Sequence, residues 1–371
     1  MKRERWIRIA LSVLAGQLLT WHSAEGQSPN RDDRSNLPLT AQMRSEVINE
    51  ILTKLKEFYV FPEVAKTIDE AIRKHMQNGE YDKITNGAEV AEKLTVHLQD
   101  ASHDKHLRVR FSVRTLPLPT GGEPSPEDRE RELQSVRSEN YGFERLERLS
   151  GNIGYIDLRF FASPEVAGNT LAAAMTFLAD TDALILDLRQ NLGGSPAMVA
   201  LVCSYFFSGS APPVHLNDIY YRPTDSTQQF WTYPYLSARR YLDKQVYVLT
   251  SKFTFSGGEG CAYHLKNLNR ATLIGETTRG GAHPTKFHRI SDHFEVGIPW
   301  ARAISPITHT NWEGVGVKPH VEVSAEQALK TAHLTALRKL LDKDSDAERL
   351  EGLNEVIKKA QKELDAMKDT K

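Results

Sequence analysis

Residues 250–284 contain a serine whose surroundings are those of a nucleophile in acyl transfer. Ser256 follows an apolar run, residues 246–249, that predicts a buried strand, and it precedes a segment with the apolar period of a helix. A serine at such a turn lies at a helix N-terminus, where unpaired backbone N–H groups and the helix dipole favour a developing anion. The same groups can stabilise the oxyanion of a tetrahedral intermediate.

A second interpretation of Ser256 is purely structural. Ser256 and Glu259 fit the capping box, in which the serine caps a helix and the glutamate reaches back to the cap. Gly257 and Gly258 indicate more than a cap, because glycine in a helix costs about 1 kcal/mol relative to alanine. Two glycines in a first turn indicate that another group approaches the backbone closely. We therefore expect Glu259 to cap the helix while the Ser256 hydroxyl serves the chemistry.

Two more glycine-bearing turns follow apolar runs. Residues 191–194, Asn-Leu-Gly-Gly, come after the run at 183–188, and residues 275–281 come after the run at 271–274. In an open parallel sheet the carboxyl ends of the strands lie along one edge, where ligands bind. Three turns of this kind therefore predict one site at that edge.

The pattern that must position these turns is α/β. Apolar runs of strand length alternate with helical periods, which predicts a mostly parallel sheet flanked by helices and joined by right-handed crossovers. The expected strands are residues 153–160, 183–188, 246–250 and 271–274, and the expected helices include 164–180 and 196–206.

The N-terminal part of the chain has a different pattern. Apolar residues at helical spacing predict three helices that pack as a small helical domain. The segment that carries His106 then alternates with period two, which predicts a strand with this histidine on its polar side. A strand histidine taken alone is most often simply solvated. We expect residues 39–112 to form the helical domain, 113–150 a linker or loop, 151–325 the α/β catalytic domain and 326–371 C-terminal helices.

The composition excludes several functions. The 371 residues carry a net charge of −1, which leaves no electrostatic footprint for nucleic acid. Cys203 and Cys261 are the only cysteines, so neither a disulfide framework nor a cysteine metal site is expected. Residues 1–26 have the basic, apolar and small-residue order of a signal peptide, followed by a polar linker at 27–38. We expect an exported protein, periplasmic or secreted, with no transmembrane segment in the mature chain.

Three motifs in this order resemble one enzyme family. They are Asp-Leu-Arg-x-Asn-x-Gly-Gly at 187–194, Thr-Phe-Ser-Gly-Gly-Glu at 254–259 and Gly-Glu-Thr-Thr-x-Gly-Gly-Ala-His at 275–283. This pattern is similar to the tail-specific (C-terminal-processing) serine peptidases, above all to the branch with the tricorn core protease and the modules of interphotoreceptor retinoid-binding protein. The resemblance implies a ClpP/crotonase-like fold and a serine endopeptidase that cleaves peptides or unstructured proteins without a cofactor or metal.

The resemblance also implies roles for residues of the serine turn. Ser256 would be the nucleophile, and the oxyanion would be held by the N–H of Gly257 and by one from Gly193 or Gly194. The tail-specific branch activates its serine with a lysine, but Gly281 occupies that position here.

The tricorn-like branch instead uses a histidine and a late glutamate. Residues 104–107, Asp-Lys-His-Leu, and residues 312–317, Trp-Glu-Gly-Val-Gly-Val, resemble these two motifs. The resemblance therefore implies that His106 is the general base and that Glu313 orients it. Lysine and leucine beside His106 depart from the family pattern of glycine and threonine, which affects the substrate pocket more than the triad.

Three alternatives remain open at this point. His283 is the last residue of the motif at 275–283, called the glycine loop below, and is a rival base. His264 is about two helical turns from Ser256, too far to take its proton. A binding module for an apolar ligand is the competing class, because retinoid-binding relatives hold such ligands on the same fold. The helix expected in residues 343–371 either docks on the core or pairs with another subunit.

Overall fold

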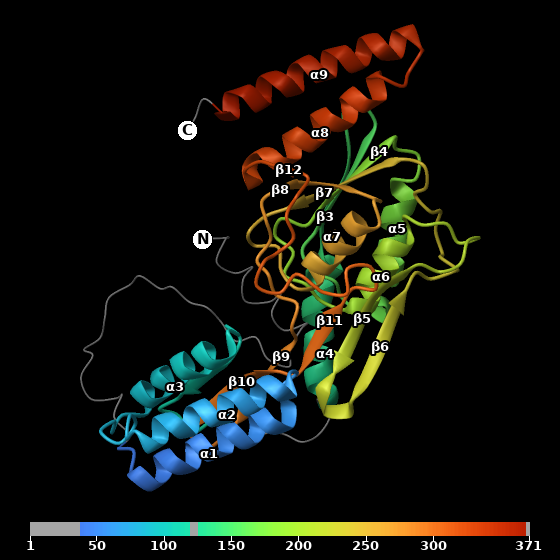
Figure 1. Cartoon of the computed structure of the whole chain (residues 1–371). Helices are drawn as coiled ribbons and strands as arrows, with labels where there is room; N and C mark the ends of the chain where they lie inside the picture. The colour runs from blue at the N-terminus through green and yellow to red at the C-terminus, as the bar shows by residue number, and fades with distance from the viewer. Residues whose placement is uncertain (1–37, 119–124, 369–371) are drawn as a thin grey trace.

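The computed structural model describes residues 38–118 and 125–368. The signal peptide expected at 1–26, and all of the expected linker except Pro38, lie outside the described residues. A helical unit formed by the N-terminal part lies at one end of the molecule, the sheet lies in the middle, and the last two helices lie at the other end (Figure 1).

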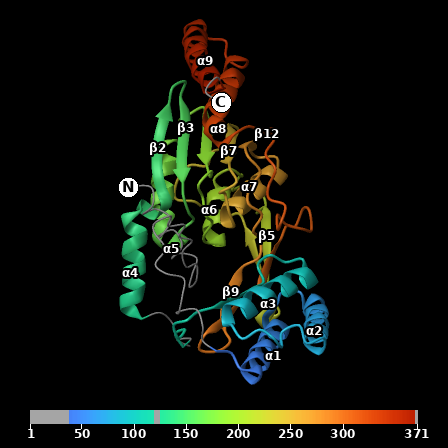
Figure 2. The ribbon, with the colours of Figure 1, turned by 90° about the vertical axis from the view of Figure 1, so that its left-hand side faces the viewer.

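The central sheet has six strands in the order β12-β8-β7-β4-β3-β2, and only β2 is antiparallel to its neighbour. Figure 2 shows β2 and β3 at one edge of this sheet. The mostly parallel sheet predicted from the alternation of strands and helices is confirmed. Its strands are β2 (Phe143–Leu149), β3 (Ile153–Leu158), β4 (Ala183–Asp187), β7 (Gln245–Thr250), β8 (Thr272–Gly275) and β12 (Val321–Glu322).

Both faces of the sheet are covered, and the strand period decides which residue faces which layer. Along β4, Leu184 and Leu186 pack in the core that includes the helices α5, α6 and α7, while Ala183 and Ile185 pack under α8. Successive strand residues point to opposite faces, so a strand covered on both sides is apolar throughout. The helices are α5 (Pro164–Phe177), α6 (Pro196–Ser204), α7 (Gly257–Asn267) and α8 (Ala325–Leu341).

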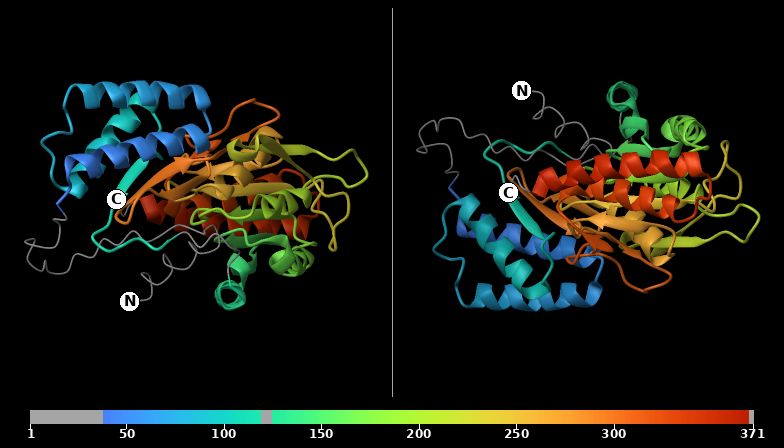
Figure 3. Two further views of the ribbon diagram at one scale, coloured as in Figure 1. Left: turned by 90° about the horizontal axis from the view of Figure 1, so that it is seen from below. Right: turned by 90° about the horizontal axis from the view of Figure 1, so that it is seen from above.

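The last helix, α9 (Ala347–Lys368), packs against α8. Figure 3 shows the two helices side by side across one end of the sheet. Its apolar stripe, Leu353, Ala360 and Leu364, is buried within the same chain. Docking on the core, one of the two outcomes expected for this stripe, is therefore the arrangement observed in the single chain.

The helical unit combines three N-terminal helices with strands from a much later part of the chain. Helices α1 (Ala41–Phe58), α2 (Pro62–Gln77) and α3 (Gly87–Ser102) share a core with β1 (Arg108–Phe111). The antiparallel strands β10 (Phe294–Pro299) and β9 (Thr285–Arg289) complete a sheet with β1, so residues from the expected α/β domain build part of this unit. The three helices agree with the sequence prediction, whereas these two strands were not predicted.

The linker expected over residues 113–150 is partly wrong. This segment contains α4 (Pro126–Ser138), a short 3-10 turn η2 (Asn140–Gly142) and the edge strand β2. Only Val136 of α4 is buried, so the helix has no apolar stripe for periodicity to detect. Its start is fixed instead by a local cap, in which the Asp128 N–H donates to the Ser125 hydroxyl oxygen over 3.1 Å.

A three-stranded antiparallel sheet lies beside the α6 and α7 helices. It consists of β11, β5 and β6 in this order, with the 3-10 turn η3 joining the last two. Side chains from β5 and β6 line a cavity that Ser256 also borders. The elements are β5 (His215–Tyr221), η3 (Arg222–Thr224), β6 (Ser226–Trp231) and β11 (Ala301–Ile304).

Candidate active site

Ser256 lies at the tight turn between β7 and α7, in a conformation that is rare for a serine. Its φ is +51° and its ψ is −117°, outside the regions that residues other than glycine ordinarily occupy. Strained residues of this kind cluster at functional sites, where the surrounding structure holds them in place. The strain at Ser256 therefore adds to the case for a chemical role.

The carboxylate of Glu259 holds this turn in place through hydrogen bonds. Its fully buried carboxylate accepts hydrogen bonds from the N–H of Ser256 at 2.9 Å, of Gly280 at 2.6 Å and of Gly281 at 2.9 Å. It also accepts the hydroxyl proton of Thr278 over 2.5 Å. Burial raises the pKa of Glu259, and these hydrogen bonds oppose the rise. The expected capping role of Glu259 thus extends to fastening the glycine loop beneath the serine.

Gly193 and Gly194 form the floor against which the serine turn packs. Their φ values of +102° and +135° require glycine, and a Cβ on Gly193 would lie 2.7 Å from the Ser256 Cβ and 3.1 Å from its Oγ. A Cβ on Gly257 would lie 3.1 Å from the Gly194 nitrogen. The structure therefore brings together all four residues that the sequence assigned to the nucleophile and the oxyanion hole.

The two candidate donors in this floor are not equivalent. The Gly193 N–H donates to Asn191 Oδ1 at 2.9 Å, so it is already committed. Within residues 38–118 and 125–368, neither the Gly194 N–H nor the Gly257 N–H has an acceptor. Of the two glycines that the resemblance offered, Gly194 is thus the better candidate for an oxyanion donor.

His106 lies in the turn before β1, between two carboxylates. Its Nδ1 is 3.1 Å from Asp104 Oδ1 and 3.2 Å from Glu313 Oε1. Burial alone would lower the pKa of His106, but the Asp104 hydrogen bond and the negative charges of Glu313 and Asp104 outweigh it, so the pKa is raised. Contacts on Nδ1 leave Nε2 as the nitrogen that can exchange a proton with substrate or serine.

Glu313 connects this histidine to the glycine loop. Its second oxygen, Oε2, accepts the backbone N–H of Ala282 at 2.6 Å and of His283 at 2.9 Å. Burial raises the pKa of Glu313, while His106 and the two backbone donors lower it. The carboxylate is therefore held in one orientation with Oε1 toward His106.

His283, the rival base, is less well placed. Its Nδ1 lies 3.6 Å from Glu313 Oε2 and is buried without a hydrogen-bond partner among the described residues. Burial lowers the pKa of His283 to about 4. Its ring packs edge-on against Phe61 at 5.4 Å between centroids. A weakly basic, enclosed imidazole of this kind is a poorer proton acceptor than His106.

The serine side and the histidine side of the site are linked through consecutive backbone donors. The Gly281 N–H binds the Glu259 carboxylate that also holds Ser256, and the next N–H, from Ala282, binds the Glu313 carboxylate that contacts His106. No direct hydrogen bond joins the Ser256 hydroxyl to His106 in the part of the chain that the structure describes.

Two residues of this site were missed by the sequence interpretation. Asp104 is a second carboxylate on His106, and it accepts the Tyr59 hydroxyl at 2.9 Å. The aspartate belongs to the quoted histidine motif, and its spacing of two residues from His106 lets one carboxylate bind both the backbone N–H and Nδ1. That spacing was the signal by which Asp104 could have been found. Tyr59 offered no such signal, because it comes from the end of a separate helix.

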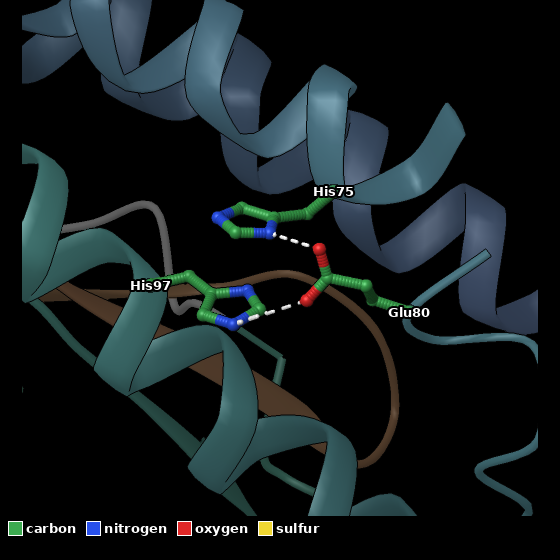
Figure 4. A group of neighbouring side chains, drawn as sticks. All are labelled: His75, Glu80 and His97. Carbon is green, nitrogen blue, oxygen red and sulfur yellow. Dashed lines mark hydrogen bonds and ion pairs between the residues drawn. The ribbon is translucent and has the colours of Figure 1, made fainter. Parts of the chain in front are cut away.

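One group of possible metal ligands exists within the described residues, and it lies in the helical unit (Figure 4). The Glu80 carboxylate lies 2.7 Å from His75 Nδ1 and 3.8 Å from His97 Nε2. The two imidazole rings stack at 3.8 Å between centroids with an interplanar angle of 15°. The Lys93 ammonium, 4.0 Å from Glu80, supplies a cation already. We read this group as a carboxylate that bridges two histidines.

Comparison with known proteins places the chain in a family. Residues 152–323 match the model of peptidase family S41, and residues 36–148 match the N-terminal domain of this peptidase family in eukaryotic IRBP. Together the two matches span most of the chain. The chain therefore belongs to peptidase family S41, in agreement with the resemblance read from its motifs.

Individual relatives agree with this assignment. The chain is 30% identical over 177 residues to the chloroplastic carboxyl-terminal-processing peptidase 2 of Arabidopsis thaliana, across 46% of this chain and 32% of the relative. It thus spans about a third of the length of that relative.

Solved structures agree on the fold. The photosystem II D1 C-terminal processing protease aligns with a TM-score of 0.50 and 15% identity, over 78% of this chain and 94% of the other. A structure from Parabacteroides merdae ATCC 43184 aligns with a TM-score of 0.53 and 18% identity, over 76% of this chain and 90% of the other. At these identities the likeness supports the architecture alone. Among the described residues, no helix is long and apolar enough to cross a bilayer.

Proposed function

We propose that this protein is a serine endopeptidase that hydrolyses peptide bonds through an acyl-enzyme on Ser256. Membership of peptidase family S41 supports the reaction class. The observation that carries the proposal is the 3.2 Å contact between His106 Nδ1 and Glu313 Oε1, since it pairs a base from the helical unit with a carboxylate fastened to the glycine loop.

The proposed reaction begins with neutral His106. Its Nε2 takes the Ser256 hydroxyl proton while Oγ attacks the carbonyl carbon of the scissile bond. Glu313 fixes the Nδ1–H tautomer and stabilises the imidazolium that forms. Asp104 adds a second negative charge at the same nitrogen. The N–H groups of Gly194 and Gly257 would receive the oxyanion, because both lack an acceptor within the described residues.

Collapse of the tetrahedral intermediate breaks the C–N bond. The imidazolium of His106 returns its proton to the departing amine, which leaves an ester between the acyl group and Ser256. A water molecule, deprotonated by the same imidazole, then attacks the ester carbonyl and releases the carboxylic acid product. No step in this sequence requires a cofactor.

A binding module for an apolar ligand remains the second candidate, because one observation favours it. A cavity of about 280 Å³ with mostly apolar walls opens beside Ser256. The same cavity suits a substrate side chain, so the two functions differ in whether Ser256 reacts.

Hydrolysis of an unstructured protein tests the proposal. Wild type should release peptides from fluorescein-labelled casein, whereas Ser256→Ala should be inactive with an unchanged circular dichroism spectrum. Ser210→Ala, in an exposed loop, is the matched control and should keep full activity. A folded wild type that cleaves nothing and carries co-purified lipid or retinoid would favour the binding module.

We propose in addition that the peptidase is exported. The basic, apolar and small-residue order of residues 1–26 supports this, and the predicted cut lies before Gln27. N-terminal sequencing of the protein recovered from a secretion-competent host should begin at Gln27. Recovery of the intact leader from the cytoplasm would contradict export.

A further inference from the structure

The cavity beside Ser256 has a composition that points to one kind of substrate side chain. Its walls come from α6, α7, β5, β6 and the glycine loop, and most of them are apolar or aromatic. No aspartate, glutamate, lysine or arginine lines it. A charged side chain placed there would lose its hydration without gaining a partner, so the cavity excludes charged residues.

Two buried polar side chains in these walls have no hydrogen bond within the described residues. The Asn217 side chain is 6% exposed and its Oδ1 is unpaired. His264 is 4% exposed, and among the described residues its ring contacts Tyr263 and Trp312 edge-on without a hydrogen bond. Buried polar groups are nearly always paired in folded proteins. Two unpaired groups in one cavity next to a nucleophile therefore indicate that a ligand completes them.

The backbone of β5 brings Asn217 to the wall of the cavity. The β5–β6 pairing shifts register between His215 and Asn217, and this irregularity lets the neighbours Leu216 and Asn217 both line the cavity, although strand neighbours ordinarily face opposite sides. On α7, His264 Nε2 lies 3.6 Å from the position that a Cβ on Gly260 would take, and the Trp312 ring lies 3.2 Å from the same position.

We propose that this cavity selects tyrosine at the substrate position whose carbonyl Ser256 attacks; the inference rests on the proposed peptidase function. The volume of about 280 Å³ admits a six-membered ring with a substituent, since about 150 Å³ holds benzene. A phenol hydroxyl donates to Asn217 Oδ1 and accepts from the N–H of His264. Burial lowers the pKa of His264 to about 3, so its ring is neutral and offers one donor.

The position of the cavity relative to the reacting carbonyl follows from its lining. Ser256 and the two oxyanion candidates Gly194 and Gly257 all border it. The substrate side chain is carried by the carbon atom that is bonded to the attacked carbonyl carbon. It therefore enters the cavity when the carbonyl oxygen points at these N–H groups. Phenylalanine would fill the same space but leave Asn217 and His264 unpaired, and such a site discriminates strongly against an analogue that lacks the hydroxyl.

Paired fluorogenic peptides that differ only in tyrosine or phenylalanine before the scissile bond test the proposal. Wild type should show a kcat/KM for the tyrosine peptide at least about 20-fold above that for the phenylalanine peptide. Asn217→Leu should bring this ratio close to one while hydrolysis of the phenylalanine peptide persists. Asn354→Leu, on the exposed side of α9, should leave the ratio unchanged. Equal rates for both peptides in wild type, or an unchanged ratio in folded Asn217→Leu, would overturn the proposal.

A binding measurement separates this inference from the proposed function. Ser256→Ala protein should bind N-acetyl-tyrosinamide at least about 20-fold more tightly than N-acetyl-phenylalaninamide, measured by calorimetry or ligand-observed NMR. Equal binding, or none, would reject the tyrosine site even if wild type cleaves proteins. Tight tyrosine binding by a wild type that cleaves nothing would keep the site and reject the peptidase.

Discussion

The backbone N–H of Ser256 donates to the carboxylate of Glu259 over 2.9 Å, and the same carboxylate binds the glycine loop. The Glu259 side chain thus both caps the helix α7 and anchors the glycine loop. The consequence is that the strained serine turn and the loop that carries Ala282 cannot move independently. Glu259 therefore binds Ser256 through the backbone N–H of the serine and not through the serine hydroxyl.

Replacing Glu259 with alanine should destabilise the protein by about 3 kcal/mol or more. Four donors, three of them backbone N–H groups, would be left buried and unpaired, and each such group costs about 1–3 kcal/mol. Urea unfolding followed by circular dichroism measures the change. Glu276→Ala is the control, because among the described residues the Glu276 side chain accepts only an exposed 3.2 Å bond from the Lys252 N–H, and its loss should cost below about 1 kcal/mol. Similar losses in both variants would contradict the anchoring role.

Substitution of Gly193 by alanine should reduce peptidase activity by about 10²-fold or more. The added Cβ would lie 2.7 Å from the Ser256 Cβ, so the floor of the proposed oxyanion hole must shift, and losing one oxyanion donor costs about 10²–10³-fold. Gly79→Ala is a matched control, since Gly79 also has a positive φ of +69° but meets only the flexible Asp82 side chain. Rates of protein hydrolysis should fall in the first variant alone.

The acid limb of the pH profile should lie above pH 6.5. A base acts only when neutral, and the pKa of His106 is raised above the ordinary histidine value of about 6.5, so activity should rise as the pH increases through that higher pKa. The measurement is kcat/KM for a chromogenic peptide between pH 5 and pH 9. A limb centred below pH 6.5 would mean that burial, and not the two carboxylates, controls this histidine.

The carboxylates can be tested separately in the same assay. Glu313→Gln removes a negative charge that favours the imidazolium, so the limb should move to lower pH and kcat should fall by about 10²-fold or more. Asp104→Asn should shift the limb in the same direction. An unchanged limb in both variants would show that another group controls the profile.

Deletion of residues 345–371 should leave the core folded but less stable. The deletion removes Leu353 and Leu364, whose burial against α8 contributes about 1.5–3 kcal/mol each. We expect native-like circular dichroism for the remaining chain and a free energy of unfolding lower by about 3–6 kcal/mol. Failure of the truncated chain to fold at all would show that α9 belongs to the folding core.

Most of the sheet could be predicted because its signals are local. The strand β4 is apolar up to Asp187 at its end, and β7 leads into the serine turn, so length and composition suffice for both. Helix α4 escaped prediction because only Val136 is buried and a polar helix has no stripe. Strands β9 and β10 escaped for another reason. β10 pairs with β1, which lies far away in the sequence, while β9 pairs with β10, and no local pattern reports that a distant strand will complete this sheet.

The residues of the site also fall into those that the sequence could predict and those that it could not. The packing of Gly193 and Gly257 around Ser256 follows from glycines in short turns, which have few explanations other than close backbone approach. The contact between His106 and Glu313 could not be derived from spacing, because it depends on how the helical unit packs on the sheet; only the family resemblance indicated it. Asn217 carried no sequence signal, since its position in the cavity depends on the irregularity in β5.

Labelling with a fluorophosphonate, followed by mass spectrometry of the digested protein, tests the central claim most directly. Wild type should carry the adduct on the peptide that contains Ser256, and the rate of labelling should fall by about 10²-fold or more in His106→Ala. His293→Ala, whose Nδ1 contacts only the Ser112 carbonyl oxygen, should be labelled at the wild-type rate. A folded wild type that takes no label at Ser256, or a His106→Ala variant labelled as fast as wild type, would contradict the account.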